Sequence, residues 1–251
     1  MDDFDKGQHF LKDKKVLEKE LEVSAINKKD KIIEIGAGTG VLTEELIKRA
    51  KEVLTFEIDE KFFEDLKKIG EKYDNLTIIF DNALFYSWHG YNKIVSNIPY
   101  YLSEEVVNKA IVDNIGEIVL IVGEKFKDLL FSQEKVGLVA RKFYSIKEIM
   151  NVPKGSFEPP PKVNSFLIKF DKKKKISKLD SIILDIVLGN GKVKNSIMRA
   201  LLKLKKTKRE SREIIKKMGL DESALEKPAK KITAALILRI EKELDRFIYN
   251  T

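Results

Sequence analysis

Residues 31–40 read KIIEIGAGTG, a short apolar run that passes directly into three alternating glycines. The apolar half, Lys31–Ile35, has the length and the isoleucine content of a buried strand. The glycine half, Gly36–Gly40, permits a tight turn and lets a ligand approach the backbone closely. The residues that follow, Val41–Arg49, have the periodicity of a helix. Strand, glycine turn and helix together predict one unit of an open α/β sheet.

The same alternation of short apolar runs and amphipathic segments continues through the first 125 residues. This pattern favours a largely parallel sheet covered by helices, and two later strands around a proline-rich loop would close it in the antiparallel sense. Ser103 is expected to be the N-cap of one helix. Further strands are predicted at Val53–Phe56, Thr77–Phe80, Lys93–Ser96, Glu117–Val122, Ser145–Val152 and Ser165–Phe170, and helices at Lys61–Glu71 and Ser103–Val112.

The chain changes character at Asp171–Lys175 (DKKKK), a charged break that we take as the domain boundary. Residues 1–172 are expected to form the cofactor-binding catalytic domain, and residues 173–251 a small, basic, all-helical domain. Residues 171–251 carry 22 Lys and Arg against 11 Asp and Glu, whereas residues 1–170 carry 26 against 29. A near-neutral body with a basic appendage indicates binding to a polyanion. Its helices are predicted at Ile182–Leu188, Ser196–Leu204, Ser211–Met218 and Ile232–Ile240.

The run Lys192–Arg209 holds eight basic residues and no acid. A lysine-rich helix is often only a well-solvated face, but a run of this density favours nucleic acid. The apolar residues Ile197, Leu201 and Leu204 are expected to face the core of the small domain. The candidates for RNA contact are Lys192, Lys194, Arg199, Lys203, Lys205 and Lys206.

Composition excludes several classes of protein. No apolar run approaches the roughly 18 residues that span a bilayer, and the charged start MDDFDKGQHFL lacks the apolar region of a signal peptide. The chain has no cysteine and two histidines, which makes a metal site improbable. We therefore expect a cytoplasmic protein, monomeric, with neither a metal nor a membrane partner.

A carboxylate follows the glycine turn at a characteristic distance. Glu57 lies 21 residues after Gly36, at the end of the next predicted strand, where it can accept hydrogen bonds from both hydroxyls of a ribose. Glu34, at the start of the turn, would repel a pyrophosphate but suits the cationic sulfonium and ammonium groups of S-adenosylmethionine. The glycines alone also fit nicotinamide and flavin sites, or a plain turn with a solvated acid. With the distant carboxylate, they predict S-adenosylmethionine.

A second motif, Asn97-Ile98-Pro99-Tyr100, follows the fourth strand at the ligand-binding edge of such a sheet. The N6 lone pair of adenine is delocalised into the ring and is a poor nucleophile. The Asn97 side-chain oxygen and a carbonyl near Ile98 would hold the N6 hydrogens and localise that lone pair. Pro99 would stiffen the turn, and Tyr100 offers a ring on which an extruded base can stack. An ordinary turn can have this sequence, but beside the glycine turn it predicts an adenine-N6 methyltransferase.

These residues together resemble the KsgA-type rRNA adenine dimethyltransferases, relatives of the Erm methyltransferases and the mitochondrial transcription factor B proteins. The match covers most of the chain. Gly7–Leu11 (GQHFL) is similar to the family's Gly-Gln-Asn-Phe-Leu, which folds over the cofactor. Phe157–Ser165 (FEPPPKVNS) is similar to Phe-x-Pro-x-Pro-Lys-Val-Asp-Ser, which borders the target base, and Gly191–Ser196 with Arg199 is similar to a basic helix of the small domain.

The resemblance implies a Rossmann-like class I methyltransferase fold of the α/β class with a small all-α C-terminal domain. It implies dimethylation of two adjacent adenines in a hairpin near the 3′ end of small-subunit (16S) rRNA, within an immature 30S particle, and a role in small-subunit biogenesis. Phe157 becomes a second stacking candidate. The implied cofactor contacts are Gln8, His9, Leu11, Glu34, Gly36, Ala37, Gly38, Glu57, Ile58, Asp81, Asn82, Ala83 and Asn97.

The sequence departs from the family pattern at several positions. Asn82 stands where the family has an Asp that accepts the amino group of the cofactor's adenine; an Asn oxygen still accepts, and Asp81 substitutes for it if the turn shifts. His9 replaces the usual Asn, Ile98 replaces Leu, and Gly123-Glu-Lys-Phe-Lys-Asp128 lacks the usual Gln-Lys-Glu.

Three other functions remain open from the sequence. One is an Erm-like enzyme that acts on 23S rRNA of the large subunit. Another is a DNA adenine methyltransferase, which shares the Asn-x-Pro-Tyr motif, although this chain has no target-recognition domain. The third is a non-catalytic, RNA-binding ribosome assembly factor that keeps a cofactor pocket as a relic.

Overall fold

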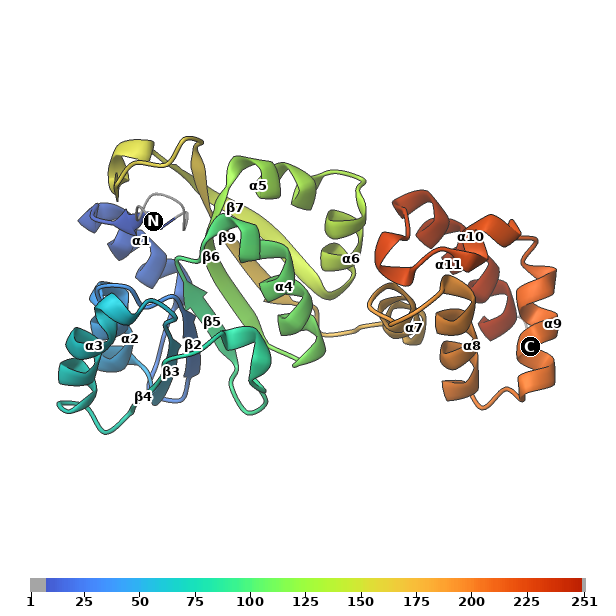
Figure 1. Cartoon of the computed structure of the whole chain (residues 1–251), viewed down its shortest axis with the longest axis horizontal. Helices are drawn as coiled ribbons and strands as arrows, with labels where there is room; N and C mark the ends of the chain where they lie inside the picture. Colours follow the sequence, from blue (N-terminus) through green and yellow to red (C-terminus); the bar gives the residue numbers. More distant parts are fainter. Residues whose placement is uncertain (1–7, 250–251) are drawn as a thin grey trace. The chain divides into compact units, whose positions relative to one another are not determined.

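The computed structural model describes residues 8–249 (Figure 1). Gly7 of the GQHFL motif lies outside the described residues. The chain divides into two compact units. The first contains the chain up to Leu129 together with Tyr144–Lys172, and the second contains Leu130–Phe143 and the chain from Lys173 onward. The helical second unit thus includes a stretch that precedes the DKKKK break.

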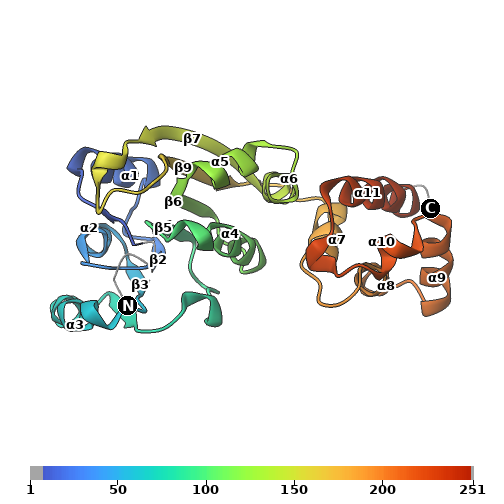
Figure 2. The same cartoon turned by 45° about the horizontal axis from the view of Figure 1, so that its top comes forward.

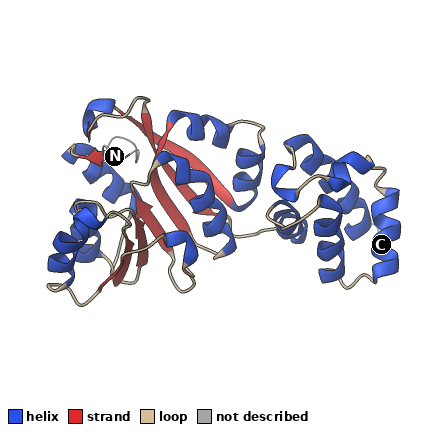
Figure 3. Ribbon diagram, in the orientation of Figure 1, coloured by secondary structure: helices blue, strands red, loops and turns tan. Residues whose placement is uncertain are grey.

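The first unit is built on a seven-stranded sheet in the order β4-β3-β2-β5-β6-β9-β7 (Figure 3). The five strands from β4 to β6 in this order are parallel, and β9 runs antiparallel between β6 and β7. The α/β class and the antiparallel closure predicted from the sequence are therefore confirmed. The strands are β2 Lys31–Ile35, β3 Glu52–Phe56, β4 Leu76–Ile79, β5 Lys93–Ser96, β6 Glu117–Gly123, β7 Tyr144–Val152 and β9 Ser165–Lys172.

The strand order reverses between β2 and β5, and this reversal decides where a ligand can bind. The connection after β2 leads towards β3 and β4, whereas β5 and β6 lie on the other side of β2. Open α/β sheets bind ligands at such a switch point, beyond the carboxyl ends of the strands. The two strand ends are joined by Ser96, whose hydroxyl accepts from Ile35 N (3.0 Å) and donates to Ile35 O (2.6 Å). The glycine turn and the Asn97 motif are thereby fixed side by side.

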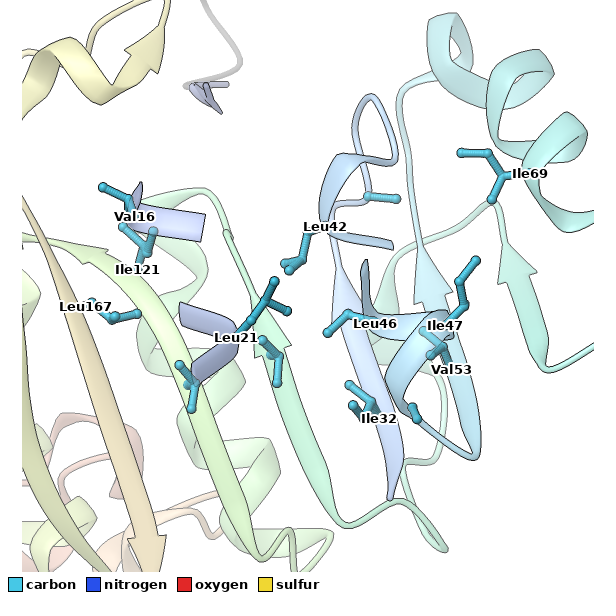
Figure 4. Close-up of a cluster of buried hydrophobic side chains, with 14 of the residues drawn as sticks. Val16, Leu21, Ile32, Leu42, Leu46, Ile47, Val53, Ile69, Ile121 and Leu167 are labelled. Carbon is cyan, nitrogen blue, oxygen red and sulfur yellow. The ribbon is translucent and has the colours of Figure 1, made fainter. Parts of the chain in front are cut away.

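Helices cover both faces of this sheet. Their apolar faces meet the strands in a continuous core, and Figure 4 labels residues from α1, α2 and the strands that belong to it. In that core Val16 and Leu21 of α1 pack with Ile121 of β6 and Leu167 of β9. The helices are α1 Lys14–Ser24, α2 Val41–Arg49, α3 Phe63–Gly70, α4 Ser103–Val112 and α5 Glu124–Phe131, with single 3₁₀ turns at Glu60–Phe62, Ala83–Phe85, Tyr100–Leu102 and Lys154–Ser156.

Helix α1 was not predicted, and side chains hold both of its ends. The Asp13 carboxylate accepts from Lys15 N at 3.0 Å at the N-terminus. At the C-terminus, Lys93 Nζ donates to Ser24 O (2.6 Å) and Lys169 Nζ donates to Val23 O (2.9 Å), so strand lysines satisfy carbonyls that the helix leaves free. These contacts fix α1 against the sheet.

The prediction that Ser103 is an N-cap was wrong. Ser103 already has helical dihedral angles, and its hydroxyl donates to Tyr100 O at 2.8 Å. The preceding 3₁₀ turn, Tyr100–Leu102, runs directly into α4 and leaves no extended residue that could act as a cap.

A separate two-stranded ribbon joins distant parts of the first unit. Strand β1 (Phe10–Leu11) pairs antiparallel with β8 (Phe157–Glu158), so the GQHFL and FEPPPKVNS motifs lie together. Lys12 Nζ donates to Glu158 Oε2 at 2.7 Å, and Lys12 N donates to Ser156 O at 2.9 Å. The peptide bond between Glu158 and Pro159 is cis.

The second unit is helical (Figure 2). Capping boxes begin two of its helices, at Ser177 with Asp180 and at Thr207 with Glu210. Ile197 and Leu201 are buried as predicted, whereas Leu204 lies just past its helix and is half-buried. The helices are α6 Lys135–Phe143, α7 Lys178–Val187, α8 Val193–Lys203, α9 Lys208–Lys217, α10 Glu222–Glu226 and α11 Ala234–Tyr249.

Candidate active site

A cavity of about 500 Å³ lies at the carboxyl edge of the sheet. Its volume falls in the range of about 300–1,000 Å³ that small-molecule sites occupy. It is lined by every residue predicted from the sequence to contact cofactor or target base, from Gln8 to Phe157. Sequence reasoning missed the apolar wall. The lining residues that were not predicted are Phe10, Leu17, Ile35, Thr39, Val41, Leu42, Phe56, Tyr101, Leu102 and Ile121.

The glycine turn has a backbone shape that only glycine adopts easily. Gly38 has φ of +53°, and a Cβ built on it would lie 2.9 Å from Cε1 of Phe10. Gly36 N and Ala37 N both donate to Phe56 O, at 2.8 and 3.1 Å, and so fix the turn to the end of β3. The turn therefore brings backbone to the cavity wall without side chains that would fill the cavity.

Glu57 is held rigidly beside this turn. Its carboxylate is 4% exposed and accepts three backbone N–H groups, from Gly38 at 2.7 Å and from Ile58 and Asp59 at 2.8 Å each. A carboxylate has about four acceptor positions, so these bonds orient the group and leave capacity for a ligand hydroxyl. The contact of Glu57 with a ribose stays a prediction.

Glu34 lies deeper than its place in the motif suggested. It belongs to β2 and is 1% exposed, and its Oε2 accepts from the hydroxyls of Thr43 (2.6 Å) and Thr55 (2.5 Å). Burial raises the pKa of Glu34 to about 7, opposed by the two threonine hydrogen bonds and reinforced by the charge of Glu57. A cationic ligand in the cavity would favour its ionised form.

The segment that carries Gln8 and His9 is tied to two loops around the cavity. Gln8 Nε2 donates to Asp59 Oδ2 (3.0 Å), and Lys61 Nζ donates to Gln8 Oε1 (3.0 Å). His9 Nδ1 lies 2.9 Å from Pro159 O, a distance suited to a hydrogen bond donated by the imidazole. These contacts connect the N-terminal motif to the turn after β3 and to the proline-rich loop.

Asn97 is oriented by a buried acid that sequence reasoning missed. Its Nδ2 donates to Oε2 of Glu20 on α1 at 3.2 Å. Its Oδ1 is buried and has no hydrogen-bond partner among the described residues. A buried acceptor without a partner costs free energy that a donor from a ligand can recover. Asn97 thus lines the cavity and carries an unused acceptor, although this oxygen itself is buried.

Tyr100 is held by the two neighbouring motifs. Its hydroxyl bonds to the hydroxyl of Ser165, the last residue of FEPPPKVNS, and its ring lies so close to Gly123 that a Cβ there would be 2.9 Å from Cδ2. Burial raises the pKa of the Tyr100 phenol. The centroid of the His9 ring lies 6.0 Å from that of Tyr100. The half-buried tyrosine ring is therefore fixed in the cavity wall.

Three further predicted contacts have structural partners of their own. Phe157 lines the cavity but is 2% exposed and packs in the hydrophobic core, so it offers less surface for stacking than Tyr100. Asn82 Oδ1 accepts from Leu84 N at 3.0 Å and caps a 3₁₀ turn, while Asp81 accepts from Tyr86 Oη at 2.9 Å. Because the Asn82 oxygen already accepts this hydrogen bond, the expected contact with an adenine amino group would have to use its second lone pair.

The six basic residues predicted to contact RNA fall into two groups. Lys203 pairs with Asp185 (2.6 Å), Lys192 pairs with Glu226, and Arg199 donates to Asn190 O (2.6 Å) and Ser196 Oγ (3.0 Å), so these three have partners within the helical unit. The side chains of the other three form neither a hydrogen bond nor an ion pair with the part of the chain that the structure describes; two of these residues are exposed and Lys206 is half-buried. They are Lys194, Lys205 and Lys206.

The cavity fits S-adenosylmethionine. It joins a fixed carboxylate (Glu57), an apolar wall, a glycine turn and Asn97, whose side-chain oxygen has no partner among the described residues. With the strand order of the sheet, these features define a class I S-adenosylmethionine-dependent methyltransferase. The chain belongs to the ribosomal RNA adenine dimethylase family, whose sequence model matches residues 3–246.

Named relatives and solved structures agree with this assignment. The chain is 35% identical over 202 residues to the "Probable ribosomal RNA small subunit methyltransferase A" of Pyrococcus abyssi, covering 77% of this chain and 74% of the relative. It is 32% identical to the "Ribosomal RNA small subunit methyltransferase A" of Clostridium botulinum, over 66% of each chain.

Two crystal structures share the fold over nearly the whole chain. A dimethyladenosine transferase from Plasmodium falciparum superposes with a TM-score of 0.65 at 24% identity, over 95% of this chain and 98% of that one. The 23S rRNA methyltransferase ErmE superposes with a TM-score of 0.62 at 20% identity, over 94% and 99%. The likeness covers the sheet and the helical region that follows it, which confirms the predicted fold class.

Within residues 8–249, no helix has the length and apolar character needed to cross a membrane. Within the same residues, no group of three or more His, Asp or Glu side chains is placed to hold a metal ion.

Proposed function

We propose that this chain dimethylates N6 of two adjacent adenines in a hairpin near the 3′ end of small-subunit (16S) rRNA. The substrate is an immature 30S particle, on which the protein acts as a cytoplasmic monomer. The observation that carries the chemistry is the buried, unpartnered acceptor Oδ1 of Asn97, a residue that lines the cofactor cavity. The choice of small-subunit rRNA is supported by the names of the Pyrococcus and Clostridium relatives.

S-adenosylmethionine, when bound, supplies the methyl group. Glu57 would accept from its ribose hydroxyls, and Ile58 and Ala83 would enclose its base. Glu34, buried at the start of the glycine turn, is placed to favour a cation in the cavity. Phe10, packed on Gly38, and the hydrogen bonds of Gln8 would exclude water from this part of the site.

The target amine would be activated by hydrogen bonding and not by a general base. Asn97 Oδ1 and a backbone carbonyl near Ile98 accept the two N6 hydrogens, which localises the nitrogen lone pair in the direction of transfer. Tyr100, fixed by Ser165 and Gly123, stacks on the extruded base. The rate enhancement comes from this alignment, because the N6 proton becomes acidic only after the methyl group has been transferred.

The basic helical unit would hold the phosphate backbone. Lys194, Lys205 and Lys206 are the strongest candidates, because their ammonium groups form no ion pair within the described chain; Lys194 and Lys205 are exposed and Lys206 is half-buried. Lys192 and Lys203 must first release an acid before they can neutralise a phosphate, so they contribute less.

The decisive experiment incubates the purified protein with labelled S-adenosylmethionine and immature small subunits, followed by nucleoside analysis of the rRNA. We expect dimethyladenosine in small-subunit rRNA, no label in large subunits, and loss of turnover in Asn97→Ala with RNA affinity within a few-fold of wild type. Label confined to large-subunit rRNA would favour an Erm-like enzyme. RNA binding without label would favour an assembly factor, and full turnover by Asn97→Ala would refute the proposed chemistry.

A further inference from the structure

A carboxyl group in the core stands out because the proposed chemistry does not use it. Glu20 is 0% exposed and lies on the inner face of α1, the face that also buries Val16, Leu21 and Ser24. Its Oε1 has no hydrogen-bond partner among the described residues. Burying a carboxyl group with one oxygen unsatisfied costs free energy, and a leucine would fill such a position at no such cost. A residue retained at this cost needs a reason.

The contact of Glu20 with Asn97 supplies that reason. Oε2 of Glu20 accepts from Asn97 Nδ2 at 3.2 Å. An asparagine amide can be turned by 180° about its last bond with little change of shape, which exchanges its donor and its acceptor. Only the orientation with Nδ2 towards α1 leaves Oδ1 as the group without a partner. The two orientations differ in what they present to a target amine: one accepts its hydrogens and the other repels them.

We propose that Glu20 is a positioning residue, which holds the Asn97 amide in the orientation that makes Oδ1 available to the target amine. The inference deepens the proposed function and rests on it, because it takes Asn97 Oδ1 as the acceptor for N6. An ionised carboxylate only accepts hydrogen bonds, and it therefore selects the Nδ2 end of the amide. Glu20 does not touch the substrate and acts through Asn97.

The surroundings of Glu20 support this role over that of a structural ion pair. The charged group that acts on it most directly is another acid, Glu34, which raises the pKa of Glu20 further. Burial is the larger cause, and the two together raise that pKa to about 8, with the Asn97 hydrogen bond opposing them. A raised pKa favours the protonated carboxyl, whose O–H can donate as well as accept, so Glu20 selects the Nδ2 end of the amide most strongly above about pH 8, where it is ionised.

The test compares Glu20→Leu and Glu20→Gln with the exposed Glu18→Leu on the same helix. We measure kcat, KM for S-adenosylmethionine and KM for immature small subunits, and unfolding by urea. Loss of one orienting hydrogen bond should lower kcat about tenfold in Glu20→Leu with both KM values unchanged. Glu20→Gln can still accept from Nδ2 and should recover part of the rate. Resistance to urea should stay equal or rise in both, and Glu18→Leu should match wild type.

Each outcome decides the question. A loss of stability with wild-type kcat in Glu20→Leu would make Glu20 purely structural and overturn the inference. Should that variant not fold, the glutamine variant decides: kcat equal to wild type overturns the inference, and a several-fold fall with unchanged KM supports it. Asn97→Ala, measured in parallel, distinguishes a failure of the proposed chemistry from a failure of the role proposed for Glu20. If it retains turnover, the proposed chemistry itself fails; if it is inactive while Glu20→Leu and Glu20→Gln are fully active, only the role of Glu20 fails.

Discussion

The buried carboxyl of Glu20 should make the stability of the sheet unit depend on pH. Its pKa is raised by burial to about 8 from an ordinary value of 4.5. The folded state therefore binds this proton more tightly than the unfolded state does. The stabilisation is fully present below pH 4.5 and is lost as the pH rises through about 8.

The size of this effect follows from the two pKa values. At about 1.4 kcal/mol per pH unit, the interval from 4.5 to about 8 corresponds to a ceiling of about 5 kcal/mol. Local opening of α1, which admits water to the ionised carboxylate, limits the loss, and we expect about 2 kcal/mol. The variant E20Q lacks the titrating group, so its stability should decline by about 2 kcal/mol less than wild type between pH 5 and pH 8.5.

Trp88 provides the assay. It is the single tryptophan of the chain, is 0% exposed, and lies in the sheet unit, so its fluorescence reports unfolding of that unit. Urea titrations of wild type and E20Q at half-unit pH steps give the two stability curves. Glu34, whose pKa is raised to about 7, remains in both proteins, and its contribution largely cancels in the difference. Parallel curves over the whole range would refute the reasoning.

Two further perturbations test the cofactor turn and the basic helices. Gly38→Ala should weaken the binding of S-adenosylmethionine at least tenfold, as measured by calorimetry. The new Cβ would lie 2.9 Å from the Phe10 ring, and the backbone at this position has a positive φ. Unchanged affinity would show that the ring moves freely. Replacing Lys205 and Lys206 together by Gln should reduce the slope of log affinity for rRNA against log salt by about one to two, whereas Lys203→Gln, which loses an ion pair with Asp185, should change it less. Equal slopes in all three proteins would place the RNA elsewhere.

The strands and most helices could be predicted because their sequences carry the right periodicity. Lys31–Ile35, Val41–Arg49 and Lys93–Ser96 have the predicted bounds in the structure. The sequence does not predict the two helices α5 and α6. The two helices, Glu124–Phe131 and Lys135–Phe143, are short and separated by a few polar residues. Their apolar faces can be recognised only when the helices are packed in the fold.

The sequence predicted the polar residues of the candidate site but not Glu20, which orients one of them. Glycines, Glu57 and Asn97 are visible in the sequence because their chemistry needs those residue types at those spacings. Glu20 is one of three glutamates within KKVLEKELEVS, and composition does not distinguish it from Glu18 or Glu22. A helical reading of Lys14–Ser24 would have done so, since positions 16, 20 and 24 share one buried face.

The pairing of Phe10–Leu11 with Phe157–Glu158 has a consequence for synthesis of the chain. One wall of the cavity comes from Phe10–Leu11, and its partner strand is translated almost 150 residues later. A nascent chain that stops after β6 has the glycine turn and Glu57 but lacks the strand against which its N-terminal segment pairs. Tight retention of S-adenosylmethionine should therefore begin late in translation, when most of the sheet unit has already emerged.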